Sequence, residues 1–333
     1  MQRRHLLATA ATGLLAAPGL LRAQGAPGGG AWPARQSVRI VVPFPPAGFS
    51  DFVSRVLTAP IGAAIGQTVV IENRPGAGGT VGADNVAKSP ADGYSFIVSH
   101  VSPHGTAPGV YPQLPYDPVT DFTHLAMVCE TPTAIMVRKD SPLRSFEDWV
   151  AAAKGAGVRV GTSGIGSIGH LQSELLSRRA GLSKLEHVPY RGTAPAIQDL
   201  LAGTIESIFE PVAGLVPQLT GSGQTMRMLA LSGRSKLSFL PEVPLLSEKG
   251  YAEVVATAWM GFSGPKGLPA EIARRMTEAT VGAIARPDVK ARMEELAVFA
   301  PESPLTGEPY AAFIREFAGK WTAVAKAANI VAS

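Results

Sequence analysis

Strand-like and helix-like segments alternate along most of this 333-residue chain, and no other pattern limits its fold so strongly. The run at 38–42 is rich in valine and ends at a proline. Apolar residues recur at helical spacing over 51–65, where Pro60 is expected to kink or split the helix. Strand-like runs at 68–71 and 95–99 follow, with a short helical segment between them. This β–α–β order predicts a largely parallel sheet with helices on both faces.

The same order recurs in a second stretch, after which helical segments dominate. Ser145 and Asp148 are spaced as a capping pair at the start of one of its helices. The strands and helices expected here are 134–137, 145–154, 158–161, 170–180, 186–189, 194–202, 207–209, 226–231 and a terminal helix over 310–328. Two such stretches predict two α/β lobes, each a mostly parallel sheet flanked by helices, with a ligand cleft between them. Residues 37–130 plus 229–333 would form lobe 1, and residues 131–228 would form lobe 2.

The first 36 residues differ from the rest and predict an export signal followed by a linker. Residues 1–23 combine an early arginine pair with an apolar stretch and end in a cleavage site near Ala23, whereas 24–36 are rich in glycine and proline. The mature chain is therefore expected in the periplasm, by either the general or the twin-arginine export route. The uncharged stretch 93–116 contains four prolines, which predicts an irregular loop region and not a membrane span.

Composition excludes several classes of protein. The 30 basic and 26 acidic residues give a formal net charge of +4, but three of the basic residues lie in the acid-free leader. The remaining chain is nearly neutral and has no basic stripe for nucleic acid. Cys129 is the single cysteine, which rules out an intrachain disulfide and a cysteine-based metal centre. With 46% hydrophobic and 17% charged residues, the chain is expected to fold around a sizeable core.

Two glycine-containing loops, each between a strand and a helix, are the strongest local indications of a binding site. The first spans 43–51, where Ser50 or Asp51 is expected to cap the helix, and the second spans 161–170. Such a loop leaves backbone N–H groups free at the helix start, and the helix dipole favours an anion there. One loop in each half predicts a clamp for a carboxylate that needs no basic side chain. An ordinary capped turn is the alternative at the first loop.

The second loop also contains the Gly164-x-Gly166-x-x-Gly169 spacing of dinucleotide-binding loops. We discount a dinucleotide site because Glu186, the acid at about the right distance, lies at the near end of its strand. The chain has no nucleophile-elbow or phosphate-binding-lysine motif, so no catalytic group, cofactor or metal is expected. Glu210 follows a strand and either points into the cleft or is a solvated strand-end acid.

A series of motifs resembles one known family. Glu72-Asn73-Arg74-Pro75-Gly76-Ala77-Gly78-Gly79 matches the family signature. The other matches, in order, are Val41–Pro45 with Gly48 and Asp51, Ala91–Tyr94, Leu114–Pro118, Val188–Gly192 and Leu240–Pro244. Together they cover about 37–330 and are similar to the Bug family, the extracytoplasmic solute receptors of tripartite tricarboxylate transporters.

This resemblance implies a two-lobed periplasmic-binding-protein fold of type II that closes on a small carboxylate and carries out no catalysis. We expect a monomer that delivers its ligand to the membrane permease subunits of such a transporter. Two other roles stay open: a subunit that senses the same kind of solute for a sensor kinase, and a secreted enzyme that uses the cleft.

The resemblance also places the ligand contacts residue by residue. They fall on Phe44, Ala47, Gly48, Phe49, Ser50 and Asp51 in the first loop, and on Ser163, Gly164, Ile165, Gly166, Ser167 and Ile168 in the second. Phe49, Ile165, Ile168 and Glu210 depart from the family pattern, and the site becomes less polar. A tricarboxylate with unpaired buried oxygens would be costly there, so we expect a monocarboxylate with an apolar or aromatic body. The alternative is an amino-bearing acid whose cation pairs with Glu210.

Overall fold

The computed structural model describes residues 32–46 and 48–332. The predicted export signal (1–23), its cleavage site and most of the predicted linker lie outside the described residues. The strands are β1 (Val38–Val42), β2 (Val69–Asn73), β3 (Ser95–His100), β4 (Phe122–Arg138), β5 (Val158–Thr162), β6 (Leu185–Pro189), β7 (Ser207–Pro211), β8 (Met226–Ser232) and β9 (Thr257–Pro265). The α-helices are α1 (Phe49–Ile65), α2 (Thr80–Ala87), α3 (Ala107–Val110), α4 (Phe146–Lys154), α5 (Ile168–Ala180), α6 (Thr193–Ala202), α7 (Val216–Leu219), α8 (Ala270–Ala285), α9 (Pro287–Glu294) and α10 (Glu308–Ala327).

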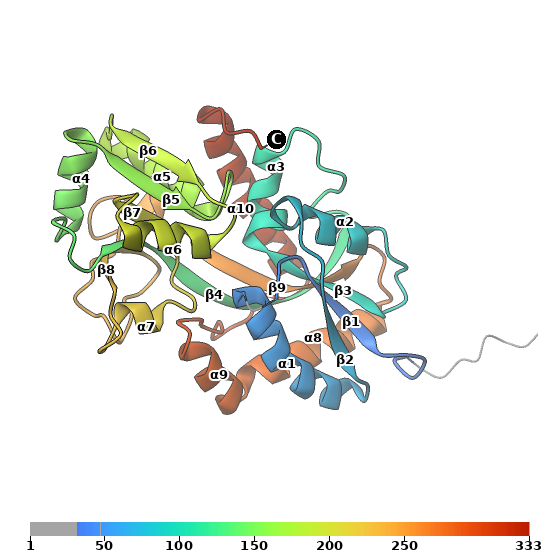
Figure 1. Cartoon of the computed structure of the whole chain (residues 1–333). Coiled ribbons are helices and arrows are strands. Elements are labelled where there is room, and N and C mark those ends of the chain that lie inside the picture. Colours follow the sequence, from blue (N-terminus) through green and yellow to red (C-terminus); the bar gives the residue numbers. More distant parts are fainter. Residues whose placement is uncertain (1–31, 47, 333) are drawn as a thin grey trace, which may run out of the picture. The chain divides into compact units, whose positions relative to one another are not determined.

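Among the described residues, the strands form one sheet in the order β2-β1-β3-β9-β4-β7-β5-β6, with β8 also paired to β4 (Figure 1). The long strand β4 joins the two halves: residues 122–132 pair with β9, and residues 133–138 pair with β7 and β8. The outer pairs β1–β2, β1–β3, β5–β6 and β5–β7 are parallel, as the β–α–β order predicts. The fold is therefore α/β, with an antiparallel centre that the sequence analysis did not predict.

Strand β9 was missed because all nine of its residues are buried. A strand covered on both faces shows no alternation of apolar and polar side chains, and a short apolar run does not distinguish a strand from a helix. The stretch was therefore included in the segment where helices were expected to dominate. Its antiparallel pairing with β3 and β4 closes the first half of the sheet.

The first half is built on alternation along β1. Val38, Ile40 and Val42 pack in one core with α1, α8 and α9, whereas Val41 packs in a second core with α2 on the other face of the sheet. Successive side chains of a strand point to opposite faces, so the four apolar residues of this five-residue strand pack against helices on both sides. The two layers of helices on this half are visible in Figure 1.

The second half repeats this arrangement around the far end of β4. Ala134 and Met136 pack with α6, whereas Ile135 and Val137 pack with α4 and α5. The predicted capping pair at the start of α4 is confirmed, because the Ser145 side chain accepts a hydrogen bond from the Asp148 backbone N–H and the Asp148 carboxylate accepts one in return.

Two local expectations are wrong: a split of α1 at Pro60, and an irregular loop over 93–116. Helix α1 continues through Pro60 without a break, because Leu57, Ile61 and Ile65 anchor it on the core on either side of the proline. The stretch 93–116 is not an irregular loop: β3 passes directly into a π-helix over residues 101–106 and then into α3. No described helix is long and apolar enough to cross a membrane.

The division into two lobes stays a proposal, and the packing favours a later second boundary than the predicted one. Residues from Leu231 to Val254 pack in the cores of the second half. The chain returns to the first half where β9 begins, opposite Pro132 of β4. We therefore place the second crossing near residue 256 and not at 229.

Candidate functional site

The first predicted loop ends in a helix start that no described side chain caps. The N-cap residue of α1 is Gly48, which has extended backbone angles and no side chain to cap the helix, and not Ser50 or Asp51 as was expected. No described residue accepts a hydrogen bond from the backbone N–H of Phe49 or Ser50. Unpaired N–H groups at the positive end of a 17-residue helix form a site for an anion.

Hydrogen bonds of the Asp51 carboxylate fix the conformation of this loop. Its carboxylate accepts hydrogen bonds from Arg55 Nε at 2.8 Å and from Asn73 Nδ2 at 2.8 Å. Asn73 Nδ2 also donates to the backbone oxygen of Phe44 at 3.1 Å. The asparagine of the Glu-Asn-Arg-Pro motif therefore ties the loop to the first turn of α1, and the buried carboxylate of Asp51 is paired with a guanidinium.

Aromatic rings form one wall beside these donors. The ring centroid of Phe44 lies 4.6 Å from that of His100, and the centroid of Phe49 lies 6.1 Å from it. Burial lowers the pKa of His100 to about 3, so the imidazole is neutral at neutral pH. The first loop thus combines free N–H groups with an uncharged aromatic surface. Ala47 lies outside the described residues.

The second predicted loop joins β5 to α5, and much of its hydrogen bonding stays inside the protein. The Ser163 N–H donates to Glu210 Oε1 at 2.6 Å, and the Gly166 N–H donates to His170 Nδ1 at 3.1 Å. The Ser167 hydroxyl caps α5 by accepting from the His170 backbone N–H. Three of the residues expected to contact ligand therefore already have hydrogen-bond partners within the chain.

Other donors of the second loop stay available. No described residue accepts a hydrogen bond from the backbone N–H of Gly164, Ile165 or Ile168. The side chain of Ile165 is 44% exposed, whereas Ile168 is buried in a core with α3 and α10. The second loop therefore offers fewer unpaired N–H donors than the sequence analysis expected.

Two stacked histidines lie under the second loop. The rings of His170 and His187 are parallel within 4°, with centroids 3.5 Å apart, and His187 Nε2 lies 2.7 Å from the Thr162 hydroxyl. Burial lowers the pKa of His170 to about 4 and that of His187 to about 3. His170 therefore acts on the loop as a neutral acceptor and packing residue, in agreement with the weak catalytic patterns of the sequence.

Glu210 is fully buried at the end of β7 and is not a solvated strand-end acid. Its two oxygens accept hydrogen bonds from the Ser163 N–H and, at 2.5 Å, from the Thr193 hydroxyl. Burial raises the pKa of this carboxyl to about 7, although both hydrogen bonds act in the opposite direction.

The segment between His100 and Val110 borders both loops, and the sequence analysis did not recognise its role. His100 packs on the rings of Phe44 and Phe49. Gly166 lies so close to Val110 that a Cβ on this glycine would come within 2.6 Å of a valine methyl. The position of the segment was the available signal, because ligands of parallel α/β sheets bind beyond the carboxyl ends of the strands and this segment follows β3.

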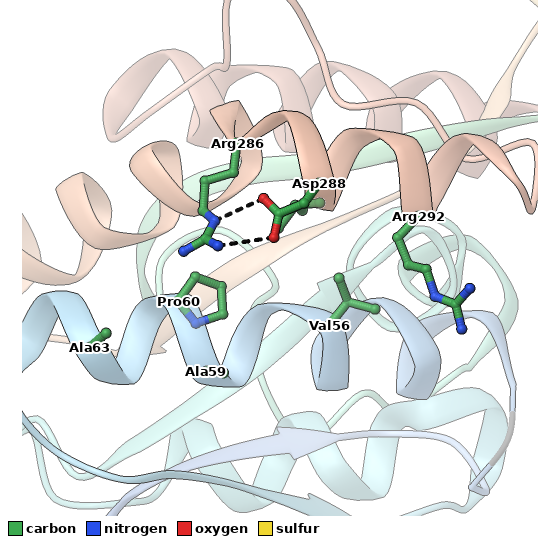
Figure 2. A pocket seen from close by; sticks show the side chains of 8 residues that line it. Val56, Ala59, Pro60, Ala63, Arg286, Asp288 and Arg292 are labelled. Atoms are coloured by element: carbon green, nitrogen blue, oxygen red, sulfur yellow. Dashed lines mark hydrogen bonds and ion pairs between the residues drawn. The ribbon is translucent and has the colours of Figure 1, made fainter.

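A surface pocket of about 420 Å³ lies elsewhere, between α1 and α9 (Figure 2). It is lined by Val56, Ala59, Pro60, Ala63, Arg286, Asp288, Val289 and Arg292, none of which belongs to the two loops. The Arg286 guanidinium is bonded to Asp288. Among the described residues, no group of three or more histidine, cysteine or acidic side chains could hold a metal ion.

Two α/β halves joined by a shared strand, each with a glycine-containing loop that leads into a helix, are typical of periplasmic binding proteins, and the solved periplasmic binding protein BugD has the same fold, at 30% identity and a TM-score of 0.78. The model of the tripartite tricarboxylate transporter family receptor matches residues 53–330. The chain belongs to this family, that of the Bug-type periplasmic solute-binding proteins, which are receptors and not enzymes.

Individual relatives agree with this assignment. BugT of Bordetella pertussis is 34% identical over 244 residues, which cover 72% of this chain and 74% of BugT. A Rhodopseudomonas palustris protein solved with adipate is 30% identical, with a TM-score of 0.80 over 90% of this chain and 99% of that chain. MatC from R. palustris, solved with bound malate, is 30% identical, with a TM-score of 0.77 over 88% of this chain and 99% of that chain.

Proposed function

We propose that this protein captures a small carboxylate in a cleft between its two halves and delivers it to the permease subunits of a tripartite tricarboxylate-type transporter. In this proposal it acts as a monomer in the periplasm, after its leader is cleaved near Ala23. The observation that carries the proposal is the uncapped start of α1, whose free N–H groups can hold a carboxylate without a basic side chain.

The ligand we propose is a monocarboxylate with an apolar or aromatic body. The rings of Phe44 and Phe49 stand beside the donors of the first loop, and Ile165 is exposed in the second. Several N–H groups of the second loop already donate hydrogen bonds within the protein. A ligand with two or three carboxylates would leave buried oxygens unpaired, at a cost of several kcal/mol.

A thermal-shift screen of the mature protein tests the proposal, after unfolding and refolding to remove co-purified ligand. The panel contains benzoate, hexanoate, adipate, malate, citrate and glutamate. A ligand that binds only the native state stabilises it by about 2.7 kcal/mol at a hundredfold excess over Kd. We expect the largest shift with benzoate or hexanoate. A larger shift with citrate would contradict the proposed ligand, and no shift with any carboxylate would contradict the proposed function.

A further inference from the structure

Glu210 is a buried acid without a basic partner. Its side chain is fully buried, and its oxygens accept hydrogen bonds from the Ser163 N–H at 2.6 Å and the Thr193 hydroxyl at 2.5 Å. In the described part of the chain, no lysine, arginine or histidine forms an ion pair with it. An ionised carboxylate in this position is therefore stabilised by uncharged donors of Ser163 and Thr193 and not by a positive charge.

The groups around Glu210 do not supply the missing positive charge. Its neighbour across the sheet is Ala134 of β4. The neighbouring elements and loops carry Glu130, Arg138, Arg159, Glu174, Arg178, Arg179, His170, Glu186, His187, Tyr190, Arg191, Asp199 and Glu206, and none of these groups shifts the pKa of Glu210 by its charge. Arg159 is bonded to Glu206, Tyr190 is bonded to Asp199, and both histidines are neutral at neutral pH. Burial, opposed by the two hydrogen bonds, accounts for the raised pKa of Glu210, which lies at about 7.

Ser163 connects Glu210 to the second loop through a hydrogen bond. Ser163 donates its N–H to the Glu210 carboxyl, and the next two residues, Gly164 and Ile165, present N–H groups without a described acceptor. An anion held by these N–H groups would lie close to a carboxyl that has no counter-ion. Two negative charges that share one poorly solvated site raise the pKa of one of the acids.

We propose that Glu210 takes up a proton when a carboxylate binds at the second loop, so that ligand capture by this receptor is linked to proton uptake. This inference rests on the proposed function and narrows the ligand class to carboxylates without an ammonium group near Glu210. The proton neutralises the acid, and both hydrogen bonds to its oxygens can persist.

The sign of the pH dependence follows from linkage. A ligand that raises the pKa of Glu210 binds the protonated form more tightly, so its affinity increases as pH falls toward 7 and levels off below it. Each unit by which the ligand raises this pKa changes the affinity by up to tenfold. A ligand that placed an ammonium group against Glu210 would do the opposite, releasing a proton and binding more weakly as pH falls.

Isothermal titration calorimetry with benzoate and with adipate tests this proposal. Titrations at pH 6, 7.5 and 8.5, each in two buffers of different protonation enthalpy, give the affinity and the number of protons taken up. We expect proton uptake at pH 7.5 and an affinity at pH 6 at least fivefold above that at pH 8.5. Glu210→Gln should abolish the uptake and flatten the affinity profile. The matched control is Glu206→Gln, at an acid that is paired with Arg159, and it should behave as the wild type.

A second measurement needs no ligand. The backbone amide resonance of Ser163 should titrate with a midpoint near pH 7 in the wild type and should not move in Glu210→Gln. If that variant does not fold, Thr193→Val removes one donor to the ionised acid and should shift the midpoint upward. Binding without proton uptake, proton release on binding, or an invariant Ser163 amide between pH 5.5 and 8.5 would each overturn the proposal. Absence of binding by every carboxylate of the panel would instead overturn the proposed function beneath it.

Discussion

The two loops look alike in sequence but differ in how they use their hydrogen bonds. Both follow a parallel strand, contain glycine and serine and lead into a helix. The start of α1 is open, with Gly48 as an N-cap that offers no side chain. The start of α5 is closed, with Ser167 as its cap and with Glu210 and His170 holding N–H groups of the loop. The helix start of the first loop is thus uncapped, whereas the second loop combines N–H groups that the protein already binds with others, at Gly164, Ile165 and Ile168, for which no described residue is an acceptor.

This difference shows that the composition of a loop predicts where its backbone N–H donors lie. It does not predict whether the rest of the protein supplies hydrogen-bond acceptors for them. The acceptors of the second loop come from other segments, since Glu210 lies at the end of β7 and His187, which supports His170, lies on β6. Such long-range partners are set by the pairing of strands. In the proposed receptor, the uncapped start of α1 attracts the carboxylate, and the unpaired N–H groups of the second loop bring it close to Glu210.

The largest expected effect is on stability, and it compares a glycine at the start of each helix by the room available for an added Cβ. A Cβ on Gly169, in the first turn of α5, would lie 1.8 Å from the backbone oxygen of Phe209. Gly169→Ala should therefore lower the free energy of unfolding by about 3 kcal/mol or more, because neither backbone can yield cheaply. Gly48→Ala is the matched control, since its Cβ would meet only the Pro45 oxygen at 3.7 Å.

Urea denaturation measures both variants. The control should lose less than about 1 kcal/mol, because its backbone angles suit alanine. Equal losses in the two variants would contradict the distinction between an open and a packed helix start.

The next largest effect concerns His170, whose neutral imidazole accepts a hydrogen bond from the second loop. We expect its contribution to the free energy of unfolding to depend on pH. The pKa of His170 is about 4 in the folded protein, against about 6.5 in an unfolded chain. The depressed value means that the unfolded state binds more protons, so this contribution is complete above pH 6.5 and is lost as pH falls toward 4. A pKa difference of one corresponds to about 1.4 kcal/mol, so the loss is on the order of 3 kcal/mol.

His170→Gln removes this titration while a side-chain oxygen can still accept from the Gly166 N–H. We expect the variant to be less stable than the wild type at pH 7.5, and the difference to shrink as pH falls from 6.5 to 4. Chemical denaturation across this range measures it. A difference that stayed constant with pH would show that His170 contributes packing alone. The variant must be compared with the wild type at each pH because Glu210 also titrates. Its pKa is raised in the folded protein, so its contribution to stability falls as pH rises from 4.5 to 7, opposite to that of His170.

Most of the outer fold could be predicted from local patterns. The valine-rich run of β1, the capping box of α4 and the apolar spacing of α10 each predict an element from local sequence alone. The centre could not be predicted, because β9 is buried on both faces and the run Leu125–Cys129 in the first part of β4 is likewise apolar without alternation. For the candidate site, the position of each loop between a strand and a helix was enough to predict both loops. Their partners, such as Asn73 on Asp51 and Thr193 on Glu210, depend on tertiary contacts that no local pattern contains.

The smallest expected effect makes the first loop resemble the second. Gly48→Ser places a hydroxyl at the N-cap of α1, where Ser167 stands in α5, and the extended backbone at Gly48 accepts a serine. The new cap should raise the free energy of unfolding by a few tenths of a kcal/mol over the wild type, because serine is a better N-cap than glycine. It should also weaken carboxylate binding several-fold, because the hydroxyl and the ligand compete for the same backbone donors. Gly48→Ala again serves as the control, since it adds the Cβ without an acceptor and separates crowding from competition. If the serine variant bound the carboxylate as tightly as the wild type while its helix was stabilised, the donors of α1 would not hold the ligand, and the attraction would have to come from the second loop.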